Sequence, residues 1–106
     1  MITHHNKMMY IASIEAIPSG EGRVFMVDET PIAVFHGRSG RGYATQANCP
    51  HKEGPLADGI VGGSVLICPL HGWKFNLESG EGPDCRITTY PVTVDSDGRI
   101  LLEIAR

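Results

Sequence analysis

Two short Cys/His segments constrain this chain more than any other feature of its sequence. The first reads Cys49-Pro50-His51 and the second reads Cys68-Pro69-Leu70-His71, with residues 52–67 between them. A thiolate and an imidazole this close on a tight loop can point at one small volume, and the proline in each loop stiffens it by fixing φ. Two such loops side by side would deliver four ligands to one site. We therefore expect the chain to fold around a metal centre.

The spacing alone leaves two kinds of metal centre open. Two thiolates and two neutral imidazoles suit a tetrahedral Zn²⁺, and they also suit a [2Fe–2S] cluster that has both histidines on one iron. In either case the segment 58–67 can pair as a hairpin and set the two ligand loops side by side. The residues that surround the ligands decide between these possibilities.

Those surrounding residues resemble the Rieske signature, Cys-x-His and Cys-x₂-His in two facing loops, with Gly-Trp after the second histidine. The resemblance implies one Rieske-type [2Fe–2S] cluster per chain. It also implies that Cys49 and Cys68 bind the inner iron, while His51 and His71 bind the outer iron near the surface. Two Fe³⁺, two sulfides and two thiolates sum to zero charge, which favours acceptance of an electron. Gly82-Pro83 falls where Rieske domains have a proline loop that covers the cluster.

The resemblance extends from Tyr10 to Ile104 and is to small Rieske ferredoxin-like proteins. Within that group, residues 49–56, 68–75 and 89–92 are most similar to the small subunit of assimilatory NAD(P)H-dependent nitrite reductase. This subfamily implies a large partner subunit that carries FAD, sirohaem and its own iron–sulfur centre. Catalytic residues would belong to that subunit, so the present chain would be an electron-transfer subunit that is not catalytic alone.

Three other functions compete with this one. A free-standing Rieske ferredoxin, which passes electrons from a flavin reductase to an aromatic-ring dioxygenase, would use the same four ligands. An oxygenase would need a mononuclear iron with two histidines and a carboxylate, and a second domain to form its pocket. The chain has no room for that domain, and its other histidines are His4, His5 and His36. A zinc-bound structural module is the third alternative.

Length and charge exclude several other classes. A chain of 106 residues accommodates one compact domain. Its net charge of −3 argues against a nucleic acid or an anionic membrane as partner. No apolar run approaches the roughly 20 residues that span a bilayer. The first seven residues contain neither the apolar region of a signal peptide nor a twin arginine, so we expect a cytoplasmic protein whose cysteines are thiols or metal ligands.

Short apolar runs separated by Gly, Pro and Asp-rich turns predict an all-β fold, a small Rieske-type antiparallel β-sandwich or barrel. No segment shows the 3.6-residue period of a helix. Hairpins are expected around Asp28-Glu29-Thr30 and at Asp95-Ser96-Asp97-Gly98. We expect residues 1–9 to be a disordered tail and residues 10–106 to form the Rieske domain. About nine strands are expected, over residues 10–14, 21–27, 31–36, 43–46, 60–61, 65–67, 73–77, 87–94 and 99–104.

Four further side chains have candidate roles. Cys85 is expected to be an ordinary strand residue, since no other Cys or His lies beside it. His36 ends an apolar strand and is expected to contact solvent. Lys52 and Lys74 flank the ligand loops, where they are either solvated charges or contacts for an acidic partner.

Four positions around the ligands predict a low reduction potential. High-potential Rieske proteins carry a disulfide between the two ligand loops, and the matching positions here are Gly54 and Leu70. Those proteins also donate hydrogen bonds to the cluster from a Ser and a Tyr. Here Trp73 and Phe75 occupy these positions, and neither has a hydroxyl group. Trp73 is expected either to shield the cluster or to pack in the core.

Overall fold

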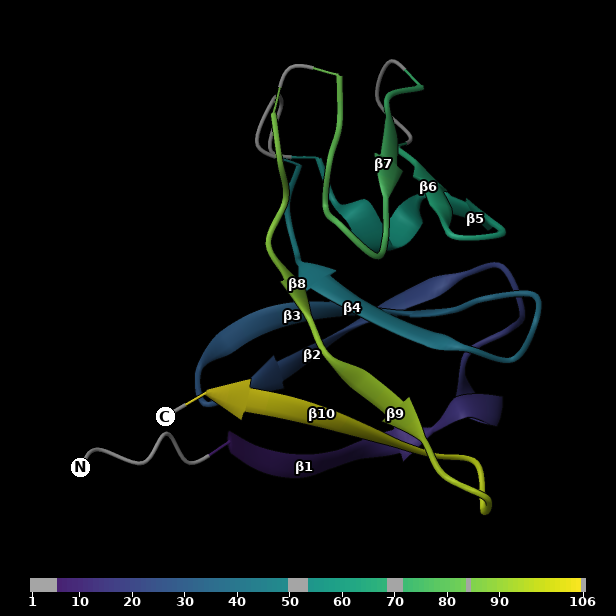
Figure 1. Cartoon of the computed structure of the whole chain (residues 1–106), viewed down its shortest axis with the longest axis vertical. Helices are drawn as coiled ribbons and strands as arrows, with labels where there is room; N and C mark the ends of the chain where they lie inside the picture. The colour runs from purple at the N-terminus through teal and green to yellow at the C-terminus, as the bar shows by residue number, and fades with distance from the viewer. Residues whose placement is uncertain (1–5, 50–53, 69–71, 84, 106) are drawn as a thin grey trace.

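The computed structural model describes residues 6–49, 54–68, 72–83 and 85–105 of the chain (Figure 1). Over these ranges the backbone forms ten strands and two 3₁₀ helices, and it forms no α-helix. The elements are β1 (Asn6–Ser13), η1 (Ile14–Ala16), β2 (Gly22–Val27), β3 (Thr30–His36), β4 (Gly42–Gln46), η2 (Leu56–Asp58), β5 (Ile60–Gly62), β6 (Val65–Ile67), β7 (Lys74–Asn76), β8 (Thr89–Tyr90), β9 (Val92–Val94) and β10 (Arg99–Ala105). No helix in the described ranges has the length and apolar character needed to cross a bilayer.

The strands form three antiparallel sheets, which confirms the predicted all-β fold. Two of them, with strand orders β1-β10-β9 and β2-β3-β4-β8, make up the larger part of the molecule, which we call the body. The third sheet has the order β5-β6-β7 and lies with η2 at one end, above the body in Figure 1. We call this third sheet the small sheet.

Local turn chemistry explains the hairpins that the sequence predicts. Strands β2 and β3 pair down to Val27 opposite Thr30, which leaves Asp28 and Glu29 as a two-residue turn. Both turn residues have positive φ, 48° and 67°, as the tight hairpin turn of this hand requires. Strands β9 and β10 form the second predicted hairpin, where Gly98 takes a φ of 80°.

The run expected as one strand over residues 87–94 is instead divided between two sheets. Its first part, β8, pairs with β4, and its second part, β9, pairs with β10. Pro91 separates the two parts. Because proline has no N–H to donate to a ladder, it suits the point where the strand leaves one sheet for the other. This crossing ties the two sheets of the body together (Figure 1).

The expected disordered tail over residues 1–9 is wrong for its last four residues. Strand β1 begins at Asn6 and pairs with β10 from Asn6 opposite Ala105 to Ser13 opposite Arg99. Met9 lies opposite Leu102 and packs against the core of the body. Backbone pairing with a strand at the other end of the chain, together with the packing of Met9, orders this segment. Residues 1–5 lie outside the described residues.

The buried side chains form two hydrophobic cores, one in the body and one beneath the small sheet. The body core contains Ile14, Ile17, Val27, Ile32, Val34, Ala44, Ile100 and Leu102. The second core, which we call the upper core, contains Ala33, Phe35, Tyr43, Cys49, Leu56, Ala57, Val61, Leu66, Cys68, Phe75, Leu77 and Ile87. Two of the predicted ligands, Cys49 and Cys68, therefore lie in one buried cluster.

Gly80 is predicted to be intolerant of a side chain. It has a φ of +83°, and a Cβ built there would overlap the carbonyl oxygen of Ile87. Gly40 has a similar φ of +91° with no atom within 4 Å of such a Cβ, so Gly40→Ala is the matched control. We expect Gly80→Ala to lower the free energy of unfolding by about 1–3 kcal/mol more than Gly40→Ala does, as measured by thermal denaturation. Equal losses in the two variants would contradict the overlap.

Candidate metal centre

The first ligand loop begins directly after the body. Cys49 follows β4 by three residues, and its backbone N–H donates a 2.8 Å hydrogen bond to the carbonyl oxygen of Gly54. Next to this bond, Asn48 and Pro55 form an isolated antiparallel bridge. Only 2% of Cys49 is exposed. The loop is thus closed at its base, and its first residue is buried in the upper core.

The second ligand loop is closed in the same way. Cys68 directly follows β6, and its N–H donates a 2.7 Å hydrogen bond to the carbonyl oxygen of Trp73, which directly precedes β7. Cys68 is 1% exposed. Gly72 has a φ of +65°, as expected for a tight turn at this position. In both loops, therefore, the cysteine N–H closes the loop onto the fifth residue along the chain.

The segment between the two loops brings the cysteines together. It begins with the short helix η2, whose Leu56 N–H donates to the carbonyl oxygen of Ala47. It continues as the antiparallel pair β5–β6, in which Ile60 lies opposite Ile67. The predicted hairpin over residues 58–67 is confirmed. Because the hairpin returns the chain to its starting point, Cys68 reaches the same core as Cys49.

Two buried cysteines in one core fit the thiolate half of the predicted ligand set. Cys49 and Cys68 form no disulfide, and each begins a closed loop. The predicted ligands His51 and His71 lie outside the described residues, so the complete set of four ligands stays a prediction. Within the described ranges, no three side chains of the types His, Cys, Asp and Glu gather as a metal site.

A third segment folds onto the upper core. The N–H of Gly82 donates a 2.8 Å hydrogen bond to the carbonyl oxygen of Cys85, and Glu81 and Arg86 form an antiparallel bridge beside it. A Cβ built on Gly82 would lie 2.5 Å from Cδ1 of Phe75, so only glycine allows this close approach. Cys85 is half-buried and packs against the upper core, but it lies between β7 and β8 and in neither strand, so its expected place in a strand is wrong.

Two aromatic side chains pack beside the cysteines. Phe75 is fully buried, and Trp73 is half-buried against the same core. Their ring centroids are 6.5 Å apart with an interplanar angle of 43°. Trp73 thus packs on the upper core, one of the two roles expected for it. The Phe75 side chain has no hydroxyl to donate a hydrogen bond to a sulfur atom.

Gln46 is a positioning residue that the sequence does not reveal. Its side-chain amide donates a 2.7 Å hydrogen bond to the carbonyl oxygen of Asn48, and its Oε1 accepts one of 2.8 Å from the N–H of Thr88. Its own N–H donates to the carbonyl oxygen of Thr88 at 3.0 Å. Gln46 therefore joins the residue before Cys49 to the strand that returns from the third segment.

The remaining candidates are His36, Lys74 and Lys52. His36 is half-buried, so it keeps the expected contact with solvent, and its Nδ1 also lies 2.6 Å from the carbonyl oxygen of Ile17. This bond holds the end of β3 against the segment that follows η1. Lys74 is exposed, as expected, whereas Lys52 lies outside the described residues.

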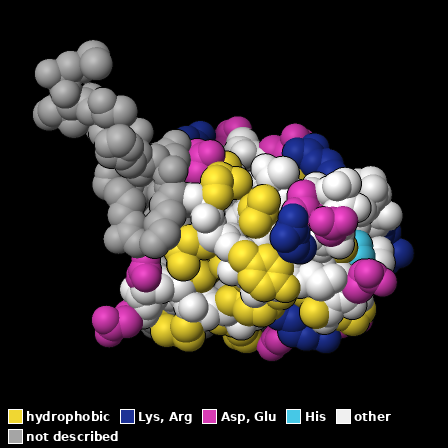
Figure 2. Space-filling view, turned by 90° about the horizontal axis from the view of Figure 1, so that it is seen from below, with side chains coloured by type: hydrophobic (Ala, Val, Ile, Leu, Met, Phe, Trp, Pro, Cys, Tyr) yellow, Lys and Arg dark blue, Asp and Glu magenta, His cyan; other side chains and the backbone are white. Residues whose placement is uncertain are grey.

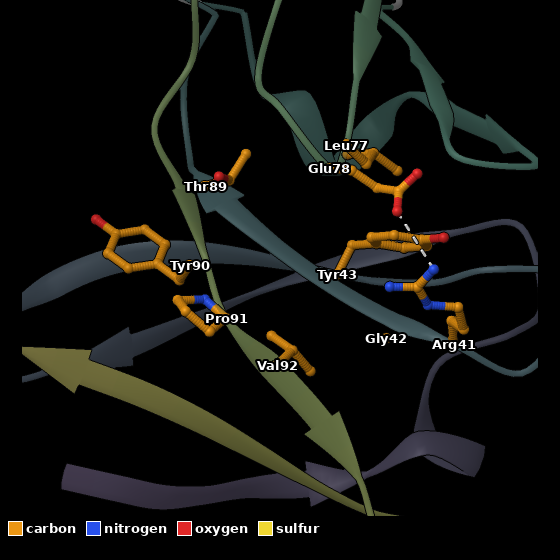
Figure 3. A pocket seen from close by; sticks show the side chains of 9 residues that line it. All are labelled: Arg41, Gly42, Tyr43, Leu77, Glu78, Thr89, Tyr90, Pro91 and Val92. Atoms are coloured by element: carbon orange, nitrogen blue, oxygen red, sulfur yellow. Dashed lines mark hydrogen bonds and ion pairs between the residues drawn. The ribbon is translucent and has the colours of Figure 1, made fainter. Parts of the chain in front are cut away.

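A pocket of about 340 Å³ opens on the side of the molecule, between β4, the β8–β9 crossing and the turn after β7 (Figure 3). The Arg41 guanidinium lies 5.2 Å from the centre of the Tyr43 ring and 3.4 Å from the Glu78 carboxylate. Among the residues that the structure describes, no cysteine or histidine lines this pocket.

Comparisons with known proteins agree with the fold. Residues 7–94 match the model of the Rieske [2Fe–2S] domain. The chain is 32% identical over 100 residues to the biphenyl dioxygenase ferredoxin subunit of a Pseudomonas species, with 89% of each protein covered. It is also 40% identical over 74 residues to the 4β-methylsterol monooxygenase of Methylococcus capsulatus, covering 58% of this chain and 20% of that protein. The chain thus spans only about a fifth of the length of the first curated relatives it matches.

A solved structure with the same fold extends over nearly the whole chain. It is a Mycobacterium tuberculosis protein assigned as an NADH-dependent nitrite reductase small subunit. The two structures superpose with a TM-score of 0.84 at 21% sequence identity, covering 94% of this chain and 96% of the other.

Removal of the Gln46 amide is predicted to loosen the metal centre. In Gln46→Ala the carbonyl of Asn48 and the N–H of Thr88 lose their side-chain partners, each worth about 1 kcal/mol. We expect iron loss under a chelator challenge to be about tenfold faster than in the wild type. Gln46→Glu retains the acceptor for Thr88 but not the donor to Asn48, and should give an intermediate rate.

Asp95→Ala is the matched control for Gln46→Ala. Asp95 accepts two backbone hydrogen bonds of 2.9 Å, from Asp97 and Arg99, at the β9–β10 turn. The Arg99 N–H lowers the pKa of the Asp95 carboxyl, in keeping with a carboxylate held by that turn. The control should lower the melting temperature without speeding iron loss. Equal iron loss in Gln46→Ala and Asp95→Ala would contradict the positioning role of Gln46.

Proposed function

Because this chain belongs to the Rieske [2Fe–2S] domain family, we propose that it is the cluster-bearing small subunit of a cytoplasmic NAD(P)H-dependent nitrite reductase. The observation that carries the proposal is the fold match to such a subunit over nearly the full length of both chains. The motif similarity over residues 49–56, 68–75 and 89–92 supports it further. We also propose that residues 6–106 form one Rieske domain.

The family makes the cofactor a Rieske-type [2Fe–2S] cluster and the activity electron transfer. When bound, such a cluster takes up and releases one electron at a time. We propose that Cys49 and Cys68 hold the inner iron as thiolates and that His51 and His71 hold the outer iron. The two cysteines are buried among apolar side chains, which keeps water away from the thiolates. The closed loop bases fix the direction in which each cysteine leaves the backbone.

An electron-transfer domain works with a redox partner protein. In the proposed complex, this partner is a large subunit with FAD and sirohaem, which takes electrons from NAD(P)H and reduces nitrite. The present chain would contribute no catalytic residue.

A second candidate function has its own support. The chain is 32% identical to a ferredoxin subunit of a biphenyl dioxygenase over nearly its whole length. In this alternative, the chain is a free-standing carrier that passes electrons from a flavin reductase to an aromatic-ring dioxygenase. Both candidates use the same cluster and the same four ligands, so the partner distinguishes them.

Reconstitution with each partner tests the proposed function. The loaded protein alone should neither oxidise NAD(P)H nor reduce nitrite, because in the proposed complex both substrates bind to the large subunit. Together with the large subunit of an NAD(P)H-dependent nitrite reductase, it should support nitrite consumption. Hydroxylation of an aromatic substrate with a flavin reductase and a dioxygenase, without any nitrite activity, would establish the alternative instead.

The reduction potential is predicted to lie toward the low end of the Rieske range, near about −150 mV. Hydrogen bonds to a sulfur favour the reduced cluster, which carries more negative charge, and each is worth about 1.5–3 kcal/mol. At about 59 mV per tenfold for one electron, each missing donor lowers the potential by about 60–130 mV. Phe75 and Trp73 replace the two hydroxyl donors of high-potential proteins.

Voltammetry at neutral pH measures this potential. Phe75→Tyr should raise it by up to about 130 mV if the new hydroxyl reaches a sulfur. Phe25→Tyr adds the same hydroxyl against the body core and should leave the potential unchanged. A wild-type potential above about +100 mV would contradict the prediction, since it lies in the upper half of the Rieske range of about −150 to +300 mV.

A further inference from the structure

The small sheet has one face buried in the upper core and one exposed face that is largely apolar. Its inner residues, Val61, Leu66 and Phe75, are fully buried. Among the large side chains of its outer face, Ile60 is 61% exposed and Ile67 is 37% exposed. We call this exposed face the outer face, and its residues are Ile60, Gly62, Val65, Ile67, Lys74 and Asn76.

Three residues form a row across this outer face. Ile60 lies directly opposite Ile67 in the β5–β6 pair, and Ile67 lies directly opposite Lys74 in the β6–β7 pair. Directly opposed residues in an antiparallel sheet have their Cβ atoms about 4.5–5.5 Å apart. The side chains of Ile60 and Ile67 thus lie side by side on the exposed face, and Lys74 lies at the end of the row. Adjacent apolar side chains with a charge at their edge match the apolar centre and polar rim of protein interfaces.

The row adjoins the second ligand loop. Ile67 directly precedes Cys68, and Lys74 directly follows Trp73, whose carbonyl oxygen accepts the hydrogen bond that closes that loop. A protein bound over the row would therefore lie beside the candidate metal centre. Electron transfer between proteins requires such proximity of the two redox centres.

The charge of the outer face indicates the kind of protein that fits it. The outer face contains one lysine and no carboxylate, although the whole chain has a net charge of −3. In the part of the chain that the structure describes, the exposed cations Arg23, Arg41 and Arg99 each have a carboxylate within 3.4 Å. Arg38, Arg86 and Lys74 are exposed and form no ion pair within the same described ranges, and of these three only Lys74 lies on the outer face.

We propose that the outer face of the small sheet is the docking surface for the redox partner protein. The partner would present apolar side chains to Ile60 and Ile67 and a carboxylate to Lys74. The inference rests on the proposed electron-transfer function and adds the place and chemistry of the contact. A second copy of this chain is a poorer occupant, because the same face of that copy would bring another lysine and no carboxylate.

The other exposed apolar side chains lie on the body. Met8 and Tyr10 lie on β1, and Val24 and Met26 lie on β2. Figure 2, which views the molecule from the side opposite the small sheet, shows apolar side chains gathered on that face as well. These residues are remote from the ligand loops, so they provide controls for the docking experiment.

The experiment compares variants of the loaded protein for binding to purified partners. The probes are the large subunit of an NAD(P)H-dependent nitrite reductase and, in parallel, a flavin reductase and an aromatic-ring dioxygenase. Ile60→Asp should weaken binding by about tenfold or more, because a buried apolar contact is replaced by a charge. Lys74→Glu should slow association and change its salt dependence, whereas Lys74→Arg should bind like the wild type.

Met26→Asp is the matched control, because it introduces the same charge at a 67% exposed strand position on the body. It should bind like the wild type. All variants should keep the visible and paramagnetic resonance spectra of the wild-type cluster. That result would show that a change in binding does not come from damage to the metal centre.

The results distinguish a failure of the proposed docking surface from a failure of the proposed function. Binding to the large subunit that Ile60→Asp and Lys74→Glu both weaken supports both proposals. The same losses with a flavin reductase or a dioxygenase support the surface and overturn the nitrite reductase assignment. If a probe binds and neither variant weakens that binding, the proposed docking surface is wrong. It is also wrong if none of the probes binds. Light scattering of the wild type and of Ile60→Asp gives a further test. A wild-type dimer that Ile60→Asp dissociates would contradict the proposed partner, because the occupant of the outer face would then be a second copy of this chain.

Discussion

The contact that the rest of the metal centre depends on is the buried row Val61, Leu66 and Phe75 on the inner face of the small sheet. These residues come from three adjacent strands, lie opposite one another in the ladders and are fully buried. Full burial of side chains of this size stabilises a fold by about 1.5–3 kcal/mol each. Phe75 additionally packs against Gly82 of the third segment. One apolar layer thus supports the second ligand loop and the third segment, and it shares its core with Cys49.

The hydrogen bonds around the two cysteines are of two kinds. In each ligand loop, the cysteine N–H closes the loop locally, at 2.8 Å to Gly54 and 2.7 Å to Trp73. Gln46 acts over a longer distance, since it joins the approach to Cys49 to Thr88, forty-two residues along the chain. The first kind of bond shapes a loop, and the second kind sets one segment against another. Together these hydrogen bonds hold the segments that contain Cys49 and Cys68, so both thiols are buried and oriented by the described residues alone.

The features that the sequence predicts correctly depend on local chemistry. The turn at Asp28 and Glu29, the β9–β10 hairpin and the β5–β6 hairpin all follow from turn residues between apolar runs. The cysteine positions follow from the ligand motif, and their common burial follows from the hairpin between them. Such signals lie within about ten residues of the element they define, so a single sequence contains them.

The features that the sequence does not reveal depend on distant partners. The segment from Asn6 to Met9 is too short to show a strand pattern of its own, and its pairing with β10 makes it a strand. The division of one apolar run at Pro91 depends on two neighbours in different sheets, β4 and β10. The Gln46 hydrogen bonds have no local signature. Likewise, the apolar run Ile60-Val61 indicates a strand, but it does not indicate that the side chain of Ile60 is exposed on the outer face.

The central claim is that one [2Fe–2S] cluster is held by two cysteines and two histidines of this chain. Pulsed electron paramagnetic resonance of the reduced protein, with ¹⁵N-labelled histidine, tests it most directly, because it detects nitrogen atoms bound to the iron. The account predicts couplings to two histidine nitrogens in the wild type, and loss of this signal in Cys49→Ser and in His71→Ala but not in His36→Ala. A paramagnetic cluster without coordinated nitrogen, or a colourless protein that contains one zinc, would contradict the account.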